Sequence, residues 1–237
     1  MPPFVSRLEQ FYQTPLGQWT QSRLGKKIVS FWPVRRRDAI LGVGYAVPYA
    51  SFLKDASGSA PFLFLKAEEA PHGASQFKNR MVVGCEGSLP FGDGQFDKIL
   101  LVHGLEASAD PQKLLRELWR VLMPEGEVLV VAPRPSGPWV RTPETPWTPG
   151  GLSFAQMLEV LKKHFFVFCA QDRALFASPF WVKTGPWGAC FFEKLGERGL
   201  WPLSGVRLIR VKKHVCQLAL APQGLPKASL ILVEESP

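Results

Sequence analysis

The chain has 237 residues, of which 46% are hydrophobic, so it can bury a sizeable core and favours one α/β domain over two. Its four cysteines form no Cys-x-x-Cys pair, which argues against a zinc site and against a disulfide framework. The sequence shows neither a secretory leader nor an apolar run of about 18 residues, so we expect a cytoplasmic protein with no membrane span and no metal.

The net charge of +8 raises the question of a nucleic-acid partner, because clustered lysines and arginines neutralise phosphates. The basic residues concentrate in residues 23–37 and 207–214, which could form one patch. No RNA-binding motif, zinc knuckle or aromatic platform accompanies them, and solvated helix and strand surfaces carry such charge as well. A nucleic-acid partner is therefore the less favoured alternative.

In chain order, the first predicted elements are helices. Apolar residues at helical spacing in residues 4–32 predict two helical pieces that break near Thr14 and Pro15. These helices could close a ligand pocket or only cover an edge of the sheet, and the spacing does not distinguish the two. Residues 40–43 then form a short apolar run that predicts the first strand, and Gly44 lies in its exit turn.

Residues 62–65 and 81–83 are predicted as the second and third strands. The apolar run at residues 98–102 predicts a strand buried in a parallel sheet, and the helix that follows begins with Asp110 as its N-cap. A further apolar run at residues 127–132 completes a strand, helix, strand unit. Such a unit is typical of a nucleotide-binding sheet.

Residues 89–126 read LPFGDGQFDKILLVHGLEASADPQKLLRELWRVLMPEG, and this block closely resembles the central block of class I S-adenosylmethionine (SAM)-dependent methyltransferases with a type 11-like domain. The shared features are Leu-Pro-Phe, a short acidic turn, Phe-Asp, a strand, Leu-Glu, Asp-Pro and Arg-Val-Leu-x-Pro. The form LGVGYAVPY at residues 41–49 resembles a bacterial branch with a degenerate glycine motif. The resemblance implies a Rossmann-like α/β fold, with a mostly parallel seven-stranded sheet flanked by helices, and S-adenosylmethionine as the cofactor.

The glycine motif departs from the family pattern at the turn after the first strand. By the resemblance, Gly42 stands where an acidic residue contacts the cofactor, and Gly44 matches the first glycine. Ala46 and Pro48 replace the next two glycines. The missing carboxylate removes a charge-assisted hydrogen bond worth about 1.5–3 kcal/mol, which is roughly one or two powers of ten in affinity. Tyr45 could compensate for this loss, or it could fill the pocket and leave the site inactive.

The same resemblance assigns the other cofactor contacts. Glu68, an acid just after the second strand, is expected to chelate the ribose hydroxyls. Glu86, one position after the strict counterpart Cys85, is expected to meet the adenine amino group, and Leu89 to line the adenine pocket. His103 directly follows the fourth strand, where it could orient a substrate or act as a base, although packing against the cofactor is the favoured expectation.

Residues 133–151 are rich in Pro, Gly, Thr and Trp and are predicted as a long loop after the fifth strand. In the resembling proteins this loop lies over the acceptor side, so Trp139 and Trp147 are candidate substrate contacts, although both could instead anchor a packed loop. The remaining predicted elements are a helix at 154–164, a strand at 165–170, a helix within 181–199, strands at 205–211 and 215–219, and an apolar run at 230–233.

We predict one methyltransferase-like domain with a helical extension at residues 1–37, a nucleotide-binding core at 38–170, and strands and a helix at 171–237. The resemblance implies methyl transfer from SAM directly to an unidentified acceptor, either a small molecule or a macromolecule. Such transfer depends mainly on proximity and alignment, so no catalytic base is assigned. The alternative is a catalytically inactive protein of the same fold that acts as a binding or regulatory partner. The sequence does not give the oligomeric state.

Overall fold

The computed structural model describes residues 4–53, 62–64, 81–147, 151–197 and 204–215. Among these residues, no helix is long and apolar enough to cross a membrane. Glu68, the predicted ribose ligand, lies outside the described residues, as do most of the predicted strand at 215–219 and the apolar run at 230–233.

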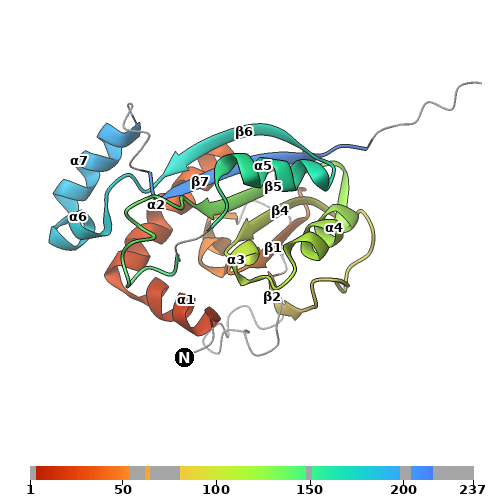
Figure 1. Ribbon diagram of the computed structural model, residues 1–237, viewed down its shortest axis with the longest axis horizontal. Helices are drawn as coiled ribbons and strands as arrows, with labels where there is room; N and C mark the ends of the chain where they lie inside the picture. Colours follow the sequence, from red (N-terminus) through yellow and green to blue (C-terminus); the bar gives the residue numbers. More distant parts are fainter. Residues whose placement is uncertain (1–3, 54–61, 65–80, 148–150, 198–203, 216–237) are drawn as a thin grey trace, which may run out of the picture.

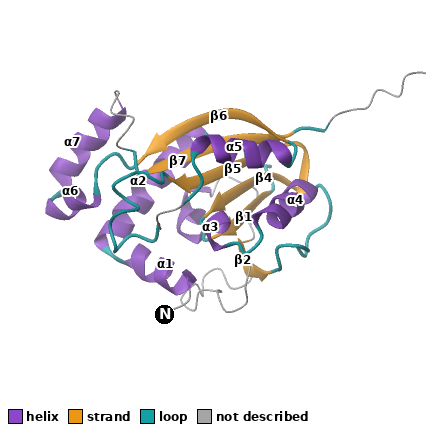
Figure 2. Ribbon diagram, in the orientation of Figure 1, coloured by secondary structure: helices purple, strands orange, loops and turns teal. Residues whose placement is uncertain are grey.

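Among the described residues, seven strands form one sheet in the order β3-β2-β1-β4-β5-β7-β6. Figures 1 and 2 show this sheet at the centre of the molecule. The neighbouring strands from β3 to β5 are parallel, whereas β7 runs antiparallel between β5 and β6. The predicted α/β sheet flanked by helices is confirmed. The strands are β1 (Ile40–Gly44), β2 (Phe62–Phe64), β3 (Met81–Val83), β4 (Phe96–Val102), β5 (Leu122–Pro133), β6 (Phe166–Ala174) and β7 (Val206–Lys213).

The strand order reverses between β1 and β4. From β1 the chain moves outward through β2 and β3, and from β4 it moves outward on the other side through β5. Gly44 at the end of β1 is in register with Val102 at the end of β4. Open α/β sheets bind their ligands outside the carboxyl ends of the strands at such a reversal. The exit turns of β1 and β4 are therefore the expected location of a site.

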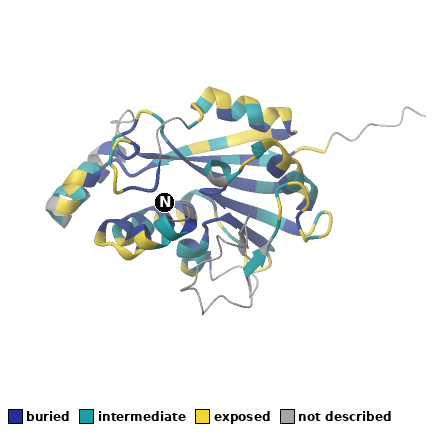
Figure 3. Ribbon diagram, turned by 60° about the horizontal axis from the view of Figure 1, so that its bottom comes forward, coloured by how far each residue is buried: buried dark blue, intermediate teal, exposed yellow. Residues whose placement is uncertain are grey.

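Helices cover both faces of the sheet, whose central strands are largely buried (Figure 3). The buried side chains form one cluster on each face. Along β4 the side chains alternate, as expected for a strand buried on both sides. Leu100 and Val102 belong to the cluster on the side of α1 and α2, and Ile99 and Leu101 to the cluster on the side of α4 and α5. The helices are α1 (Phe4–Gln13), α2 (Pro15–Phe31), the 3-10 helix η1 (Val47–Leu53), α3 (Gly104–Ala107), α4 (Pro111–Val121), α5 (Phe154–Lys163), α6 (Pro179–Thr184) and α7 (Pro186–Glu197).

Side-chain caps confirm the predicted helix starts. The break between α1 and α2 falls at Thr14, whose hydroxyl accepts a hydrogen bond from the backbone N–H of Gly17 (3.0 Å). At the start of α4, the Asp110 carboxylate accepts a hydrogen bond from the backbone N–H of Lys113 (3.1 Å). Ser153 forms a capping box at the start of α5.

Some predicted boundaries are wrong. β5 begins at Leu122, directly after α4 and five residues earlier than predicted, because its first part pairs irregularly with β4 and includes Glu125 at a φ of 63°. The helix predicted within residues 181–199 is two helices, because Gly185 between α6 and α7 has a φ of 152°. β6 runs four residues past its predicted end.

Candidate functional site

The turn after β1 is in direct contact with the exit of β4. Gly44 has a φ of 76°, and a side chain at this position would collide with the backbone of Val102 and Gly104. The backbone N–H of Tyr45 donates a hydrogen bond to the carbonyl oxygen of Val102 (2.8 Å). Glycine alone allows the two exits to approach so closely, so Gly44 has a structural role at this turn.

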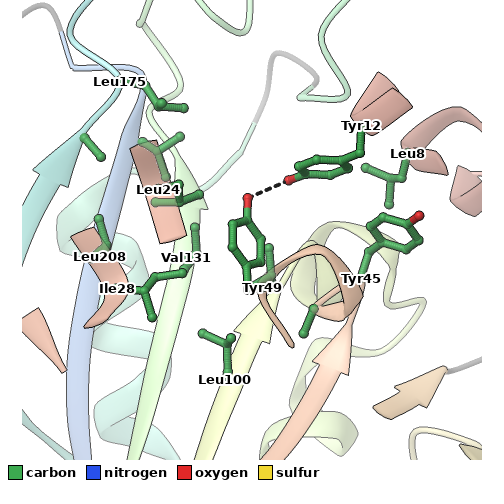
Figure 4. Packing of buried hydrophobic residues seen from close by; sticks show 14 of the residues in the cluster. Leu8, Tyr12, Leu24, Ile28, Tyr45, Tyr49, Leu100, Val131, Leu175 and Leu208 are labelled. Atoms are coloured by element: carbon green, nitrogen blue, oxygen red, sulfur yellow. Dashed lines mark hydrogen bonds between the residues drawn. The ribbon is translucent and has the colours of Figure 1, made fainter. Parts of the chain in front are cut away.

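The chain's three tyrosines gather over this turn, although one of them is distant in sequence. Tyr12 comes from α1, Tyr45 from the turn and Tyr49 from η1 (Figure 4). The rings of Tyr12 and Tyr45 stack, with centroids 5.6 Å apart and an interplanar angle of 27°. The hydroxyls of Tyr12 and Tyr49 share a hydrogen bond of 2.8 Å. α1 therefore closes the carboxyl edge of the sheet above the glycine turn.

His103 extends this polar chain from the exit of β4. Its Nε2 lies 3.2 Å from the Tyr12 hydroxyl, and the residue is buried with a left-handed φ of 56°. Burial lowers the pKa of His103 to about 3, so the imidazole is neutral near pH 7. Burial also raises the pKa of Tyr12 and of Tyr49, which keeps both hydroxyls protonated. The chain from Tyr49 through Tyr12 to His103 is thus made of uncharged hydrogen-bonding groups.

A carboxyl group in α3 also acts on this chain. Burial raises the pKa of Glu106 to about 7. After burial and the neighbouring tyrosines, the charge of Glu106 also raises the pKa of Tyr12. Near neutral pH the Glu106 carboxyl is present in both protonation states, so it can accept or release a proton.

The two tryptophans of the loop after β5 both reach this region. Trp147 lies beside His103, with ring centroids 5.5 Å apart, and it meets the ring of Trp139 edge-on at 5.3 Å. Trp139 is fully buried, and its indole N–H donates a hydrogen bond to the carbonyl oxygen of Ala177 (3.0 Å). Trp147 therefore lies next to the polar chain, while Trp139 anchors the loop to the segment between β6 and α6.

Glu86 and Leu89 hold the loop after β3 against α4. The Glu86 carboxylate accepts hydrogen bonds from the backbone N–H groups of Ala109 (2.6 Å) and Asp110 (2.5 Å). Leu89 is buried in the cluster beneath α4, and its backbone N–H donates to the Glu117 carboxylate (2.8 Å). These contacts give both residues a structural role, and their contacts to a cofactor stay predictions.

Gly42 lies within β1, two residues before Gly44, and it pairs with β2 and β4. Sequence reasoning did not single out Tyr12 or Tyr49. The one available signal was the scarcity of tyrosine, because the chain has three and two of them fall in the degenerate glycine segment. The predicted site residues that the structure gathers at the carboxyl ends of β1 and β4 are Gly44, Tyr45, Ala46, His103 and Trp147.

Sequence comparison matches the central part of the chain to methyltransferases. The family model described as a methyltransferase domain matches residues 62–130. The demethylmenaquinone methyltransferase of Thermus thermophilus is 44% identical over 52 residues, which are 21% of this chain and 24% of that protein. The matched segment thus spans about a quarter of that relative's length.

Solved structures share the fold over most of the chain at low sequence identity. A SAM-dependent methyltransferase from Aquifex aeolicus has a TM-score of 0.64 at 12% identity, with 88% of this chain and 98% of that chain covered. A possible histamine N-methyltransferase from Thermotoga maritima has a TM-score of 0.61 at 17% identity, with 89% and 96% covered. The [4+2]-cyclase SpnF has a TM-score of 0.55 at 19% identity, with 81% and 80% covered. The family model therefore matches the central part of the chain, and these solved structures share its Rossmann-like fold.

Proposed function

We propose that the protein is a SAM-dependent methyltransferase that transfers a methyl group directly to an acceptor not yet identified. The observation that carries this proposal is the contact between the exits of β1 and β4 at Gly44. It lies at the reversal of strand order, where open α/β sheets bind ligands. The methyltransferase match over residues 62–130 includes all of β4, so sequence and fold support the same edge of the sheet.

In this proposal the turn at Gly44 and Ala46 receives the methionine end of the cofactor, because small residues let a ligand approach the backbone closely. Glu68 holds the ribose hydroxyls through its two carboxylate oxygens. His103 lies against the adenosine portion, and Trp147 beside it faces the acceptor. These assignments follow the family pattern, carried over to the matching positions of this sequence.

The polar groups over the turn offer a replacement for the carboxylate that is missing at Gly42. The hydroxyls of Tyr12 and Tyr49, together with the neutral imidazole of His103, form hydrogen bonds there without a buried charge. Because the stacked rings of Tyr12 and Tyr45 cover the turn, cofactor binding requires these two rings to separate. Bound SAM supplies the activated methyl group, and the chain's own residues orient the reactants and exclude water.

An acceptor that loses a proton during the transfer needs a base. His103 is poorly suited to this role near neutral pH, because its pKa of about 3 is too low. Glu106, with a pKa of about 7, has the better matched proton affinity. We therefore propose Glu106, and not His103, as the base for a proton released near Tyr12.

A second candidate function is a binding or regulatory role without methyl transfer. One observation favours it: the tyrosine cluster over the turn is already packed, with Tyr45 and Tyr49 buried and Tyr12 hydrogen-bonded to Tyr49. In addition, one protein of this fold is named as a [4+2]-cyclase, and a fold by itself does not determine the chemistry.

Calorimetric titration with S-adenosylhomocysteine, the demethylated product, distinguishes the two functions. We expect binding by the parent chain and a loss of roughly 10–100-fold in Glu68→Ala, because a charge-assisted hydrogen bond is worth about 1.5–3 kcal/mol. The matched control Glu69→Ala, one residue further along, should leave the affinity unchanged. If the parent does not bind at millimolar ligand, the methyltransferase proposal fails and the binding role is favoured. If both variants bind like the parent, only the ribose assignment fails.

A further inference from the structure

The helices α6 and α7 form a hairpin between β6 and β7 that projects from one end of the molecule (Figure 1). The proposed methyltransferase activity does not use this hairpin. Its two helices pack mainly on each other, and α6 also contacts α2.

The inner side of the hairpin is firmly attached to the body. The Glu193 carboxylate of α7 accepts hydrogen bonds from the backbone N–H groups of Leu175 and Ala177 (3.0 Å each). At Gly196 the helix approaches Phe176 so closely that a side chain at Gly196 would overlap its ring. The hairpin is therefore a fixed projection, which holds its outer side in a defined orientation.

The outer side carries a continuous row of aromatic rings, which we call the aromatic ridge: Phe180 and Trp181 of α6, and Phe191 and Phe192 of α7. Phe180, Trp181 and Phe191 are 65%, 42% and 62% exposed. Neighbouring rings are in contact, with centroid distances of 5.6 Å for Phe180–Trp181, 4.9 Å for Trp181–Phe192 and 5.7 Å for Phe191–Phe192. Scattered exposed apolar residues are ordinary, but a contiguous apolar surface indicates an interaction site.

Basic side chains accompany the aromatic ridge. Lys183 lies in the last turn of α6, where its ammonium forms an ion pair with Glu144 (2.7 Å), and Lys194 lies in the last turn of α7; both side chains are exposed. The acidic residue of α7 next to the ridge, Glu193, is turned inward onto backbone N–H groups. Since the whole chain carries a net charge of +8, the hairpin presents its aromatic rings, with Lys194 nearby, on a positively charged protein.

We propose that the aromatic ridge docks the protein onto an anionic lipid bilayer surface. Phenylalanine and tryptophan side chains settle at the boundary between headgroups and acyl chains, and lysines beside them are attracted to anionic lipids. The ridge projects from the body, so its rings can insert into the headgroup region of a bilayer. Charge complementarity then selects an anionic surface over a neutral one.

Co-sedimentation of the full chain with lipid vesicles tests this proposal. We expect binding to vesicles of phosphatidylcholine with phosphatidylglycerol, weaker binding to phosphatidylcholine alone, and release at about 1 M salt, where the screening length falls to about 3 Å. The double variant Phe180→Ser/Phe191→Ser should reduce partitioning at least about tenfold, because each ring leaves water on docking.

Phe165→Ser is the matched control, since Phe165 is 71% exposed but precedes β6, outside the hairpin. It should bind vesicles like the parent, and both variants should keep the parent's melting temperature because the replaced rings are exposed. The proposal is overturned if the parent ignores anionic vesicles, or if Phe165→Ser loses as much binding as the double variant. It is also overturned if the double variant binds vesicles like the parent. If that variant in addition changes the mass measured by light scattering, the ridge is a contact between copies of the chain.

Discussion

Replacing Gly44 with alanine tests whether the β1 turn is held against the exit of β4. The φ of 76° at Gly44 is left-handed, and an L-residue there costs about 1–2 kcal/mol. A Cβ atom would also lie 2.6 Å from the backbone nitrogen of Gly104 and 2.7 Å from its Cα. Forcing such packed atoms apart costs about 1–3 kcal/mol. We therefore expect Gly44→Ala to lower the free energy of unfolding by roughly 2–5 kcal/mol.

Two other glycines separate these contributions. Gly94 has a φ of 59°, but a Cβ there would meet no atom nearer than 3.9 Å, so Gly94→Ala should cost only the conformational strain of about 1–2 kcal/mol. Gly87 has neither strain nor crowding, with its nearest neighbour at 3.6 Å, so Gly87→Ala should be nearly neutral. Urea unfolding followed by circular dichroism measures all three variants. If Gly44→Ala costs no more than Gly94→Ala, the close approach of the two exits is refuted. Because of this crowding, a bulky side chain at position 44 would disturb the turn itself, so such a variant would not block cofactor binding selectively.

Three further predictions concern ionisable groups. Because burial lowers the pKa of His103 from 6.5 to about 3, its imidazole NMR signals should not titrate from about pH 5 to pH 8. The stability that the neutral imidazole contributes should be lost as the pH falls from 6.5 towards 3. A titration midpoint of the His103 signals near pH 6.5 would contradict this. Burial raises the pKa of Glu106 from 4.5 to about 7, so the folded state favours the protonated carboxyl. When measured above pH 7, Glu106→Gln should therefore have a higher melting temperature than the parent, and this gain should shrink as the pH falls towards 4.5. A gain that does not depend on pH would argue against the raised pKa. Glu193→Ala leaves the backbone N–H groups of Leu175 and Ala177 without their acceptor, so it should lower the free energy of unfolding, measured in urea, by about 2–4 kcal/mol. Glu193→Gln should show a smaller loss. If the alanine variant is as stable as the parent, these hydrogen bonds do not hold α7.

Local signals explain which parts of the fold were predictable. The unit of β4, α4 and β5 has an apolar strand, an N-cap at Asp110 and apolar residues at helical spacing, and each signal acts within a few residues. The early start of β5 was not predictable, because the irregular pairing that includes Glu125 depends on the neighbouring strand β4. The division between α6 and α7 at Gly185 was missed because apolar residues at helical spacing continue on both sides of it.

The candidate site was only partly predictable. Gly44 and His103 follow apolar runs that end at the same edge of the sheet, so their proximity follows from the strand pattern. The polar chain does not, because Tyr12 and Tyr49 are 37 residues apart and Tyr12 and His103 are 91 apart. Only the packing of α1 against the end of the sheet brings these side chains together, and no local pattern encodes that contact.

In the proposed function, the cofactor binds where β1 and β4 end, beneath α1. The most direct test is to follow the imidazole NMR signals of the parent chain during titration with S-adenosylhomocysteine. His103 lies at this edge, hydrogen-bonded to Tyr12, whereas His164 follows α5 and bonds the carbonyl oxygen of Val160 (2.8 Å). We predict a saturable shift of the His103 signals while those of His164 stay in place. Unchanged His103 signals at millimolar ligand, or equal shifts of both histidines, would contradict the claim.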